Sequence, residues 1–172
     1  AKTINDYHLH FEDWWERDLH AMVLRDRNHP SVFCWSIGNE IPERDGSSNG
    51  AAWSRRLAEA LRALDPTRPV TSAVNPVIPP PAWDSSRPAD ETPEQRAEAL
   101  LQYGDEKTSD FVAPLDLVGY NYMDGRYERD GKLFPNRVIC GTESFPLDSD
   151  IVWDRVERLP HVIGDFLWTS YD

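Results

Sequence analysis

Cysteine is scarce in this sequence, and its scarcity excludes two kinds of architecture. The 172 residues include only 2 Cys, at positions 34 and 140. A disulfide framework or a cysteine-based metal site would need more cysteines at closer spacing. Both residues lie within apolar runs, so we expect Cys34 and Cys140 to be buried free thiols.

Positive charge and long apolar runs are also lacking. The chain has 18 Lys and Arg against 30 Asp and Glu, which leaves a formal net charge of −12. Such a field repels phosphate groups, so neither nucleic acid nor an anionic membrane surface is an expected partner. No apolar run is long enough to span a bilayer, and the first residues lack the basic-then-apolar layout of a signal peptide. The sequence therefore favours a cytoplasmic location.

The sequence does contain an alternation of helical and strand patterns. Apolar residues recur at spacings of three and four over 5–26 and from Trp53 to Leu64, which predicts two amphipathic helices. A Thr-Pro-x-Gln capping box at 92–95 opens a helix to about 109, and a short helix is expected at 151–159. Apolar stretches between them predict strands at 32–38, 69–74, 115–122, 137–143 and 161–168.

Two segments interrupt this alternation and are expected to be loops. Residues 76–91 are rich in proline, and residues 123–136 are polar. Trp83 in the first of these is either an outer platform for a sugar ring or, as we expect, an anchor that holds the loop.

Strands that are apolar on both faces and alternate with helices are typical of an α/β fold with a parallel sheet. In such folds the functional residues follow the carboxyl ends of the strands. The polar and aromatic residues at those ends are Asn39, Glu40, Asn75, Asn121, Tyr122, Glu143 and Trp168.

Two of these strand ends carry a glutamate. Two carboxylates that face one cleft suit glycoside hydrolysis, in which one is the nucleophile and the other the general acid and then the general base. The alternative is that Glu40 and Glu143 each cap a helix or pair with an arginine. A single strand-end glutamate favours that alternative, whereas two such ends favour catalysis.

Three segments resemble glycoside hydrolase family 2, the family of β-galactosidases, β-glucuronidases and β-mannosidases. Residues 26–40 (DRNHPSVFCWSIGNE) are similar to its acid/base signature, with only Cys34 slightly outside the pattern. Residues 140–144 (CGTES) resemble its nucleophile strand, and residues 162–169 (VIGDFLWT) resemble its last barrel strand. The similarity runs along the whole chain, in the order of the family.

The resemblance implies a role for five residues. Glu40 would be the general acid/base and Glu143 the nucleophile. Asn39 would bind the 2-hydroxyl of the sugar, and Tyr122 would contact and tune the nucleophile. Trp168 would form the floor of the sugar site, although a core-filling role is an equal alternative from the sequence alone. The retaining mechanism needs no metal ion or organic cofactor, so none is expected.

Within the family, the segments at 119–122 and 164–172 resemble bacterial β-galactosidases, so a β-linked galactoside or oligosaccharide is the expected substrate. A β-glucuronidase or β-mannosidase is the first alternative. A carbohydrate-binding barrel without catalysis and a plain scaffold domain are the others.

Matched to the family, the five predicted strands are strands 4 to 8 of a (β/α)8 TIM barrel, which usually needs about 250 residues. Residues 1–172 are therefore expected to be one fragment of a catalytic barrel, without strands 1–3 and the last helix. Such a fragment would be weak or inactive by itself. Its open barrel edges predict self-association.

Overall fold

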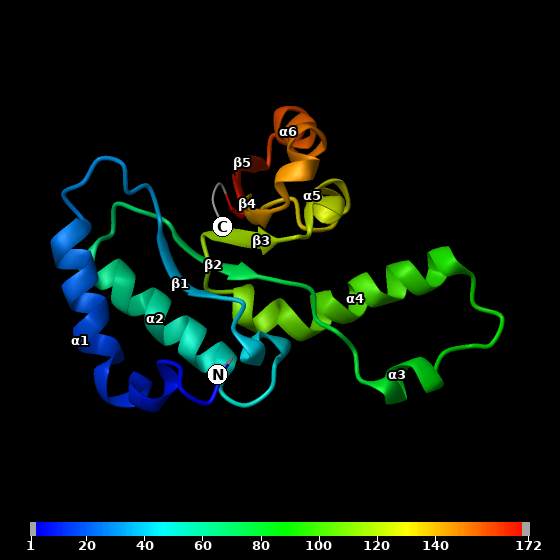
Figure 1. The fold of residues 1–172 in the computed structure, drawn as a ribbon, viewed down its shortest axis with the longest axis horizontal. Helices are drawn as coiled ribbons and strands as arrows, with labels where there is room; N and C mark the ends of the chain where they lie inside the picture. The colour runs from blue at the N-terminus through cyan, green and yellow to red at the C-terminus, as the bar shows by residue number, and fades with distance from the viewer. Residues whose placement is uncertain (1–2, 170–172) are drawn as a thin grey trace.

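The computed structural model describes residues 3–169, and a parallel sheet organises them. The sheet has five strands in the order β1-β2-β3-β4-β5, and each neighbouring pair is parallel (Figure 1). This confirms the expected α/β class and is the arrangement of part of a TIM barrel. The strands are β1 (Trp35–Asn39), β2 (Val70–Val74), β3 (Leu117–Asn121), β4 (Ile139–Ser144) and β5 (Val162–Leu167).

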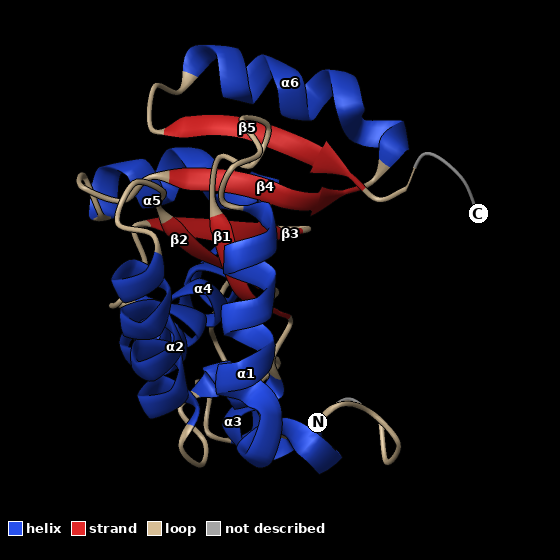
Figure 2. Cartoon of the chain, turned by 90° about the vertical axis from the view of Figure 1, so that its left-hand side faces the viewer, coloured by secondary structure: helices blue, strands red, loops and turns tan. Residues whose placement is uncertain are grey.

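Helices connect the strands and cover one face of the sheet. Figure 2 shows α6 along β5, with α1 and α2 on the side of β1. Short 3-10 turns follow β1, β3 and β4, so three strand ends turn sharply away from the sheet. The helical segments are α1 (His8–Asp26), η1 (Pro42–Asp45), α2 (Gly50–Leu64), α3 (Pro81–Ser85), α4 (Pro93–Val112), η2 (Asp124–Arg126), α5 (Tyr127–Leu133), η3 (Pro146–Asp148) and α6 (Ser149–Arg158).

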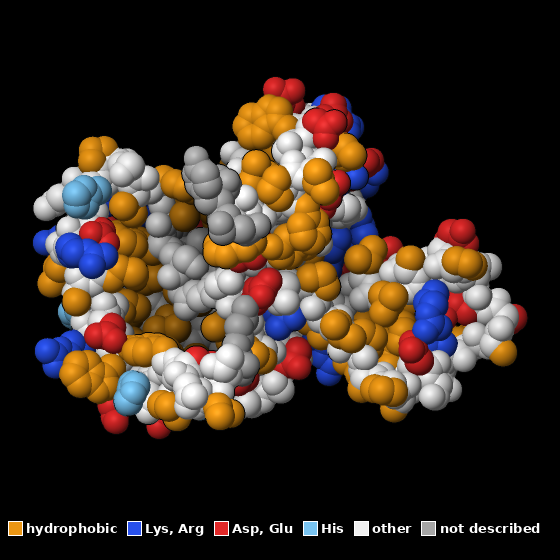
Figure 3. Space-filling view, viewed as in Figure 1, with side chains coloured by type: hydrophobic (Ala, Val, Ile, Leu, Met, Phe, Trp, Pro, Cys, Tyr) orange, Lys and Arg blue, Asp and Glu red, His pale blue; other side chains and the backbone are white. Residues whose placement is uncertain are grey.

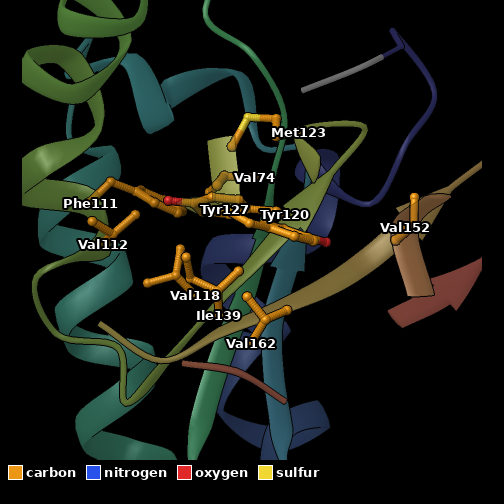
Figure 4. Packing of buried hydrophobic residues seen from close by; sticks show 10 residues of the cluster. All are labelled: Val74, Phe111, Val112, Val118, Tyr120, Met123, Tyr127, Ile139, Val152 and Val162. Carbon is orange, nitrogen blue, oxygen red and sulfur yellow. The ribbon is translucent and has the colours of Figure 1, made fainter. Parts of the chain in front are cut away.

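The buried apolar residues form two clusters between the helices and the sheet. One joins α1 and α2 to β1 and β2, and at its centre Val23, Leu61 and Val70 are fully buried. The other joins β2–β5 to α4, α5 and α6 (Figure 4), and in it Tyr127 and Ile139 are almost fully buried. Because both clusters lie on the helix side, they leave the inner face of the sheet to smaller and more polar residues.

An aromatic contact shows that the sheet is strongly curved. Phe33, just before β1, stacks on Phe166 in β5, with ring centroids 6.3 Å apart and ring planes 7° apart. In a flat sheet the first and fifth strands would lie about 19 Å apart, at about 4.8 Å per strand. The two outer strands therefore approach each other across the inner face, as the curvature of a barrel requires.

The structure differs from three of the sequence-based predictions, one strand boundary and two expected loops. The strand expected at 32–38 begins at Trp35. The amide of Val32 instead closes a turn onto His29, and the amide of Trp35 donates to the carbonyl of Pro69, directly before β2. The Pro-rich segment contains the short helix α3, whose first residue is Pro81. The polar segment contains η2 and α5, because its arginines surround the buried carboxylate of Asp130 rather than facing solvent.

The α3 helix and the first half of α4 extend away from the sheet (Figure 1). The predicted capping box is confirmed, since Thr92 and Gln95 exchange both hydrogen bonds. Trp83 packs edge-on against Tyr103 at 5.9 Å, and Arg87 lies 5.0 Å over its ring. Trp83 is therefore an anchor of this extension, as expected, rather than an open sugar platform.

Apolar side chains remain exposed around β5 and α6. Ile163, Phe166 and Leu167 of β5 are 47–52% exposed, and Trp153 of α6 is 53% exposed. Figure 3 shows such residues near the top of the molecule, where these elements lie. Within residues 3–169, no helix combines the length and apolar character needed to cross a membrane.

The 172-residue chain is expected to self-associate, because β1 and β5 each pair with one strand only among the described residues and present open edges. Sedimentation velocity over a concentration series should show the mean mass rising with concentration. Ile163→Lys, which places a charge on the exposed part of β5, should reduce the association. A clean monomer at the highest concentration would contradict the prediction.

Candidate active site

All five strands bring polar or aromatic residues to the same edge of the sheet, and four of them bring predicted site residues. The side chains come from the ends of strands that are distant in sequence but parallel in space, so the fold alone gathers them. The predicted site residues at this edge are Asn39 at the end of β1, Glu40 after it, Tyr122 after β3, Glu143 in β4 and Trp168 after β5.

The backbone at this edge continues the ladder of hydrogen bonds between strands. The amide of Glu40 donates to the carbonyl of Ala73 in β2 at 2.8 Å. The amide of Tyr122 donates to the carbonyl of Glu143 in β4, also at 2.8 Å. The positions of these residues along the strands are therefore set by their neighbours, and not by a free loop.

Two residues of this edge have an unusual backbone conformation. Glu40 has a φ of 50° and Tyr122 a φ of 55°, both in the left-handed region that non-glycine residues rarely occupy. Each follows its strand directly and keeps its amide in the ladder, and the left-handed turn changes the direction of the side chain and of the chain that follows. Such local strain is concentrated at functional sites in proteins.

The phenol of Tyr122 connects the two glutamates electrostatically. Burial, then the hydrogen bond and charge of Glu143, and then the charge of Glu40 raise the pKa of Tyr122 above its ordinary value. Both carboxylates are therefore close enough to Tyr122 to act on its ionisation.

Two of the structural uses considered for the glutamates can be compared with the described contacts. Among the described residues, no Lys, Arg or His forms an ion pair with Glu143. The N-cap positions of the helical segments that follow β1 and β4 are Ile41 for η1 and Phe145 for η3. Neither glutamate therefore has the place of a helix cap.

Asn121 is fully buried at this edge. The sequence placed it at a strand end but indicated no role for it. Its amide nitrogen donates to Oδ1 of Asn39 at 2.9 Å and to Oε1 of Glu40 at 3.2 Å. Its oxygen accepts a 2.6 Å hydrogen bond from the hydroxyl of Thr142 in β4. A polar residue at the last position of an apolar strand was the only sequence signal for this role.

Arg44 is a second residue that the sequence analysis missed. Its guanidinium is buried below the edge and donates to the backbone carbonyls of Ile41, Asn75 and Pro76 at 2.8–3.0 Å. Burial lowers the pKa of Arg44, while the charges of Asp45 and Glu40 oppose that shift. Arg44 therefore joins the segments after β1 and β2 and adds a positive field near Glu40.

Trp168 lies on the surface of the described chain. Its side chain is 60% exposed, and its amide donates to the carbonyl of Ser144 at 2.9 Å. Within residues 3–169, Trp168 is therefore not a core-filling residue. The exposed ring of Phe145 lies nearby against Tyr122, with centroids 4.5 Å apart, so aromatic surface borders the nucleophile strand.

A large cavity lies beside this edge. It has a volume of about 830 Å³ and lies between the first half of α1, β1 and α2. Asn39 lines it together with Phe11, Ile37 and Trp53, whereas Glu40, Glu143 and Tyr122 do not. The cavity thus borders the open side of β1 and is not the space between the two carboxylates.

Cys34 and Cys140 are both free thiols, as expected. Cys140 is buried, but the expectation that Cys34 is buried was wrong, because it lies before β1 and is half-buried. Burial raises the pKa of Cys140 to about 12, so it is not a reactive thiolate at neutral pH. No three His, Cys, Asp or Glu side chains in residues 3–169 are grouped to hold a metal ion.

Comparison with known proteins gives one family. The family described as glycosyl hydrolases family 2, TIM barrel domain, matches residues 8–95. A β-galactosidase of Bacteroides ovatus is 27% identical over 99% of this chain and 22% of its own length. A putative β-glucuronidase of Formosa agariphila is 43% identical, but over only 36% of this chain and 5% of its own.

A solved structure gives the same result. The crystal structure of a glycosyl hydrolase family 2 member from Bacteroides cellulosilyticus is 40% identical to this chain, with a TM-score of 0.77. It covers 96% of this chain and 19% of its own. The chain thus spans about a fifth of the length of these relatives.

Glu143→Gln is expected to lower the pKa of the Tyr122 phenol toward its ordinary value, because the amide removes the negative charge that opposes formation of the phenolate. The measurement is ¹³C NMR of tyrosine Cζ, titrated from about pH 8 to 12, with Tyr122→Phe to assign the signal. Glu16→Gln, on the exposed side of α1, is the matched control. An unchanged titration in Glu143→Gln would place Glu143 away from the phenol.

Proposed function

Because the chain belongs to glycosyl hydrolase family 2, we propose that it carries both catalytic carboxylates of a retaining exo-β-glycosidase. Glu143 is the nucleophile and Glu40 the general acid/base. The observation that carries this proposal is the connection of the two glutamates at one sheet edge. Glu143 and Glu40 both raise the pKa of Tyr122, the amide of Tyr122 donates to the carbonyl of Glu143, and Asn121 donates to Glu40.

The first step of the proposed reaction forms a covalent intermediate. A carboxylate oxygen of Glu143 bonds to the anomeric carbon as the bond from that carbon to the glycosidic oxygen breaks. The electron pair stays on the departing oxygen, and Glu40 supplies the proton that neutralises it. Tyr122 is proposed to hold the nucleophile in place, and Glu40 begins this step protonated.

The second step returns the enzyme to its starting state. Glu40, now ionised, takes a proton from water while the water oxygen bonds to the anomeric carbon and the bond to Glu143 breaks. Two displacements on opposite faces retain the β configuration. Asn39 is proposed to hold the 2-hydroxyl of the sugar, and Trp168 to provide an apolar floor beneath the ring.

We propose a terminal β-D-galactoside as the substrate. The relative from Bacteroides ovatus that matches nearly the whole chain is a β-galactosidase, and so is a Vibrio vulnificus protein 30% identical over 88% of this chain. A β-glucuronide is the second candidate, favoured by the shorter but more identical match to the Formosa agariphila protein. A β-mannoside is the third.

We further propose that residues 1–172 act as part of a larger barrel. The relatives are about five times longer than the matched region, and β1 and β5 are open among the described residues. A complete sugar site would use residues from the rest of such a barrel. The 172-residue chain alone is expected to be a weak catalyst, and the variants below belong in the full-length protein.

Glu143→Gln is expected to reduce hydrolysis at least about a thousandfold, because the nucleophile is lost. The assay compares nitrophenyl β-galactoside, β-glucuronide and β-mannoside, and the sugar on which the unmodified enzyme is most active identifies the substrate. Glu16→Gln on α1 is the control and should retain full activity. If the unmodified protein hydrolyses none of the three nitrophenyl glycosides, that result would instead favour a carbohydrate-binding or scaffold role.

Azide separates the roles of the two glutamates. In Glu143→Ala, azide replaces the nucleophile and displaces the leaving group once, so the product is the α-glycosyl azide. In Glu40→Ala, azide attacks the glycosyl-enzyme intermediate, so two displacements give the β-glycosyl azide. The configuration is read by NMR of the product, and the opposite pair of products would exchange the two roles.

A further inference from the structure

The amide of Asn121 spans from β1 to β4, the two strands that carry the glutamates. It donates to Asn39 and Glu40 on the β1 side and accepts from Thr142 on the β4 side. The residue is 0% exposed, so these contacts are made without competition from solvent.

The hydroxyl of Thr142 and the two acceptors on the β1 side together fix which way this amide faces. Thr142 donates to the oxygen of Asn121 at 2.6 Å, which leaves the NH2 group toward β1. The reversed amide would place its oxygen against the oxygens of Asn39 and Glu40 and lose two hydrogen bonds. The Thr142 side chain is itself confined, since its methyl group would lie 2.7 Å from a Cβ on Gly119.

An amide N–H only donates, so the carboxyl oxygen that it faces has to accept. A protonated Glu40 has one oxygen that bears the hydrogen and one that does not. The contact with Asn121 makes Oε1 the oxygen without the hydrogen. We propose that Asn121, oriented by Thr142, is a positioning residue that keeps the acidic proton of Glu40 on Oε2.

This inference rests on the proposed function and refines its proton transfers. In the first step the proton leaves Oε2 for the glycosidic oxygen, which takes the electron pair of the broken bond. Asn121 then donates to an ionised carboxylate, and a hydrogen bond to a charged group is stronger. In the second step Oε2 accepts the proton of the attacking water. Asn121 itself carries no proton at any stage.

Leaving-group dependence tests this role. A methyl glycoside needs its departing oxygen protonated, whereas a 2,4-dinitrophenyl glycoside departs as a stable anion and does not. Both are made with the sugar that the full-length enzyme hydrolyses. The measured quantity is kcat/KM, because it reports the first chemical step for both substrates.

Asn121→Ala is expected to lower kcat/KM about a hundredfold for the methyl glycoside and less than about tenfold for the dinitrophenyl glycoside. Thr142→Val should show the same pattern at about a tenfold loss for the methyl glycoside, because the amide is no longer oriented. Thr142→Ser keeps the hydroxyl and should restore most of the activity. The matched control is Thr71→Val, which removes a buried hydroxyl of β2 that has no partner among the described residues.

The outcomes distinguish this inference from the proposed function. Equal losses of kcat/KM on the two substrates would show that Asn121 has a merely structural role. No loss on either substrate would show that Asn121 has no role in the reaction. Either result overturns the inference. If Asn121→Ala fails to fold in thermal unfolding, the comparison of Thr142→Val with Thr142→Ser decides alone. An unmodified enzyme without glycosidase activity, or an active Glu143→Gln, would overturn the proposed function and this inference with it.

Discussion

The candidate site depends on the curvature of one parallel sheet. The glutamates belong to the first and fourth strands, which would be about 14 Å apart in a flat sheet. In the structure, Asn121 of β3 reaches Glu40 of β1 across β2. Small residues make room for this contact, since β2 has Ala73 paired with Gly119 of β3 at the same level. The inner face therefore closes over the strand ends without being filled by large side chains.

The carboxylates of this chain fall into two groups according to their partners. Asp130 is buried among Arg126 and Arg129 and accepts a 2.5 Å hydrogen bond from Tyr120. Asp65 has hydrogen bonds from Thr67, Trp35 and Arg68 that hold its pKa below the usual range. Both carboxylates are held by several donors, and both join elements of the core.

The candidate catalytic glutamates each have a neutral donor beside them, the phenol of Tyr122 for Glu143 and the amide of Asn121 for Glu40. Arg44 also lies near Glu40, and three of its N–H groups donate to backbone carbonyls. A general acid/base passes through both protonation states, and a neutral donor can bond to a carboxyl oxygen in either one.

The sequence predicted the parallel sheet and the strand ends that carry the candidate site residues, because periodicity and strand-end polarity are local signals. It also predicted the capping box at Thr92. It missed α5, because a polar segment reads as a loop unless the buried partner of its arginines is known. It missed the role of Asn121 for a similar reason. The amide matters through partners on β1 and β4, which are 82 and 21 residues away along the chain.

Irregular strand pairing provides the link between curvature and site geometry. The β2–β3 pair is regular throughout. In this pair only β3 carries site residues, and only at its end. The β1–β2, β3–β4 and β4–β5 pairs each shift register near the strand ends that carry the candidate residues. A bulge bends its strand and redirects the next side chain. In β4 the shift pairs Glu143 rather than Thr142 with Asn121, so the hydroxyl of Thr142 and the carboxylate of Glu143 are both available at one edge. A strictly alternating strand would have directed one of them into the helix layer.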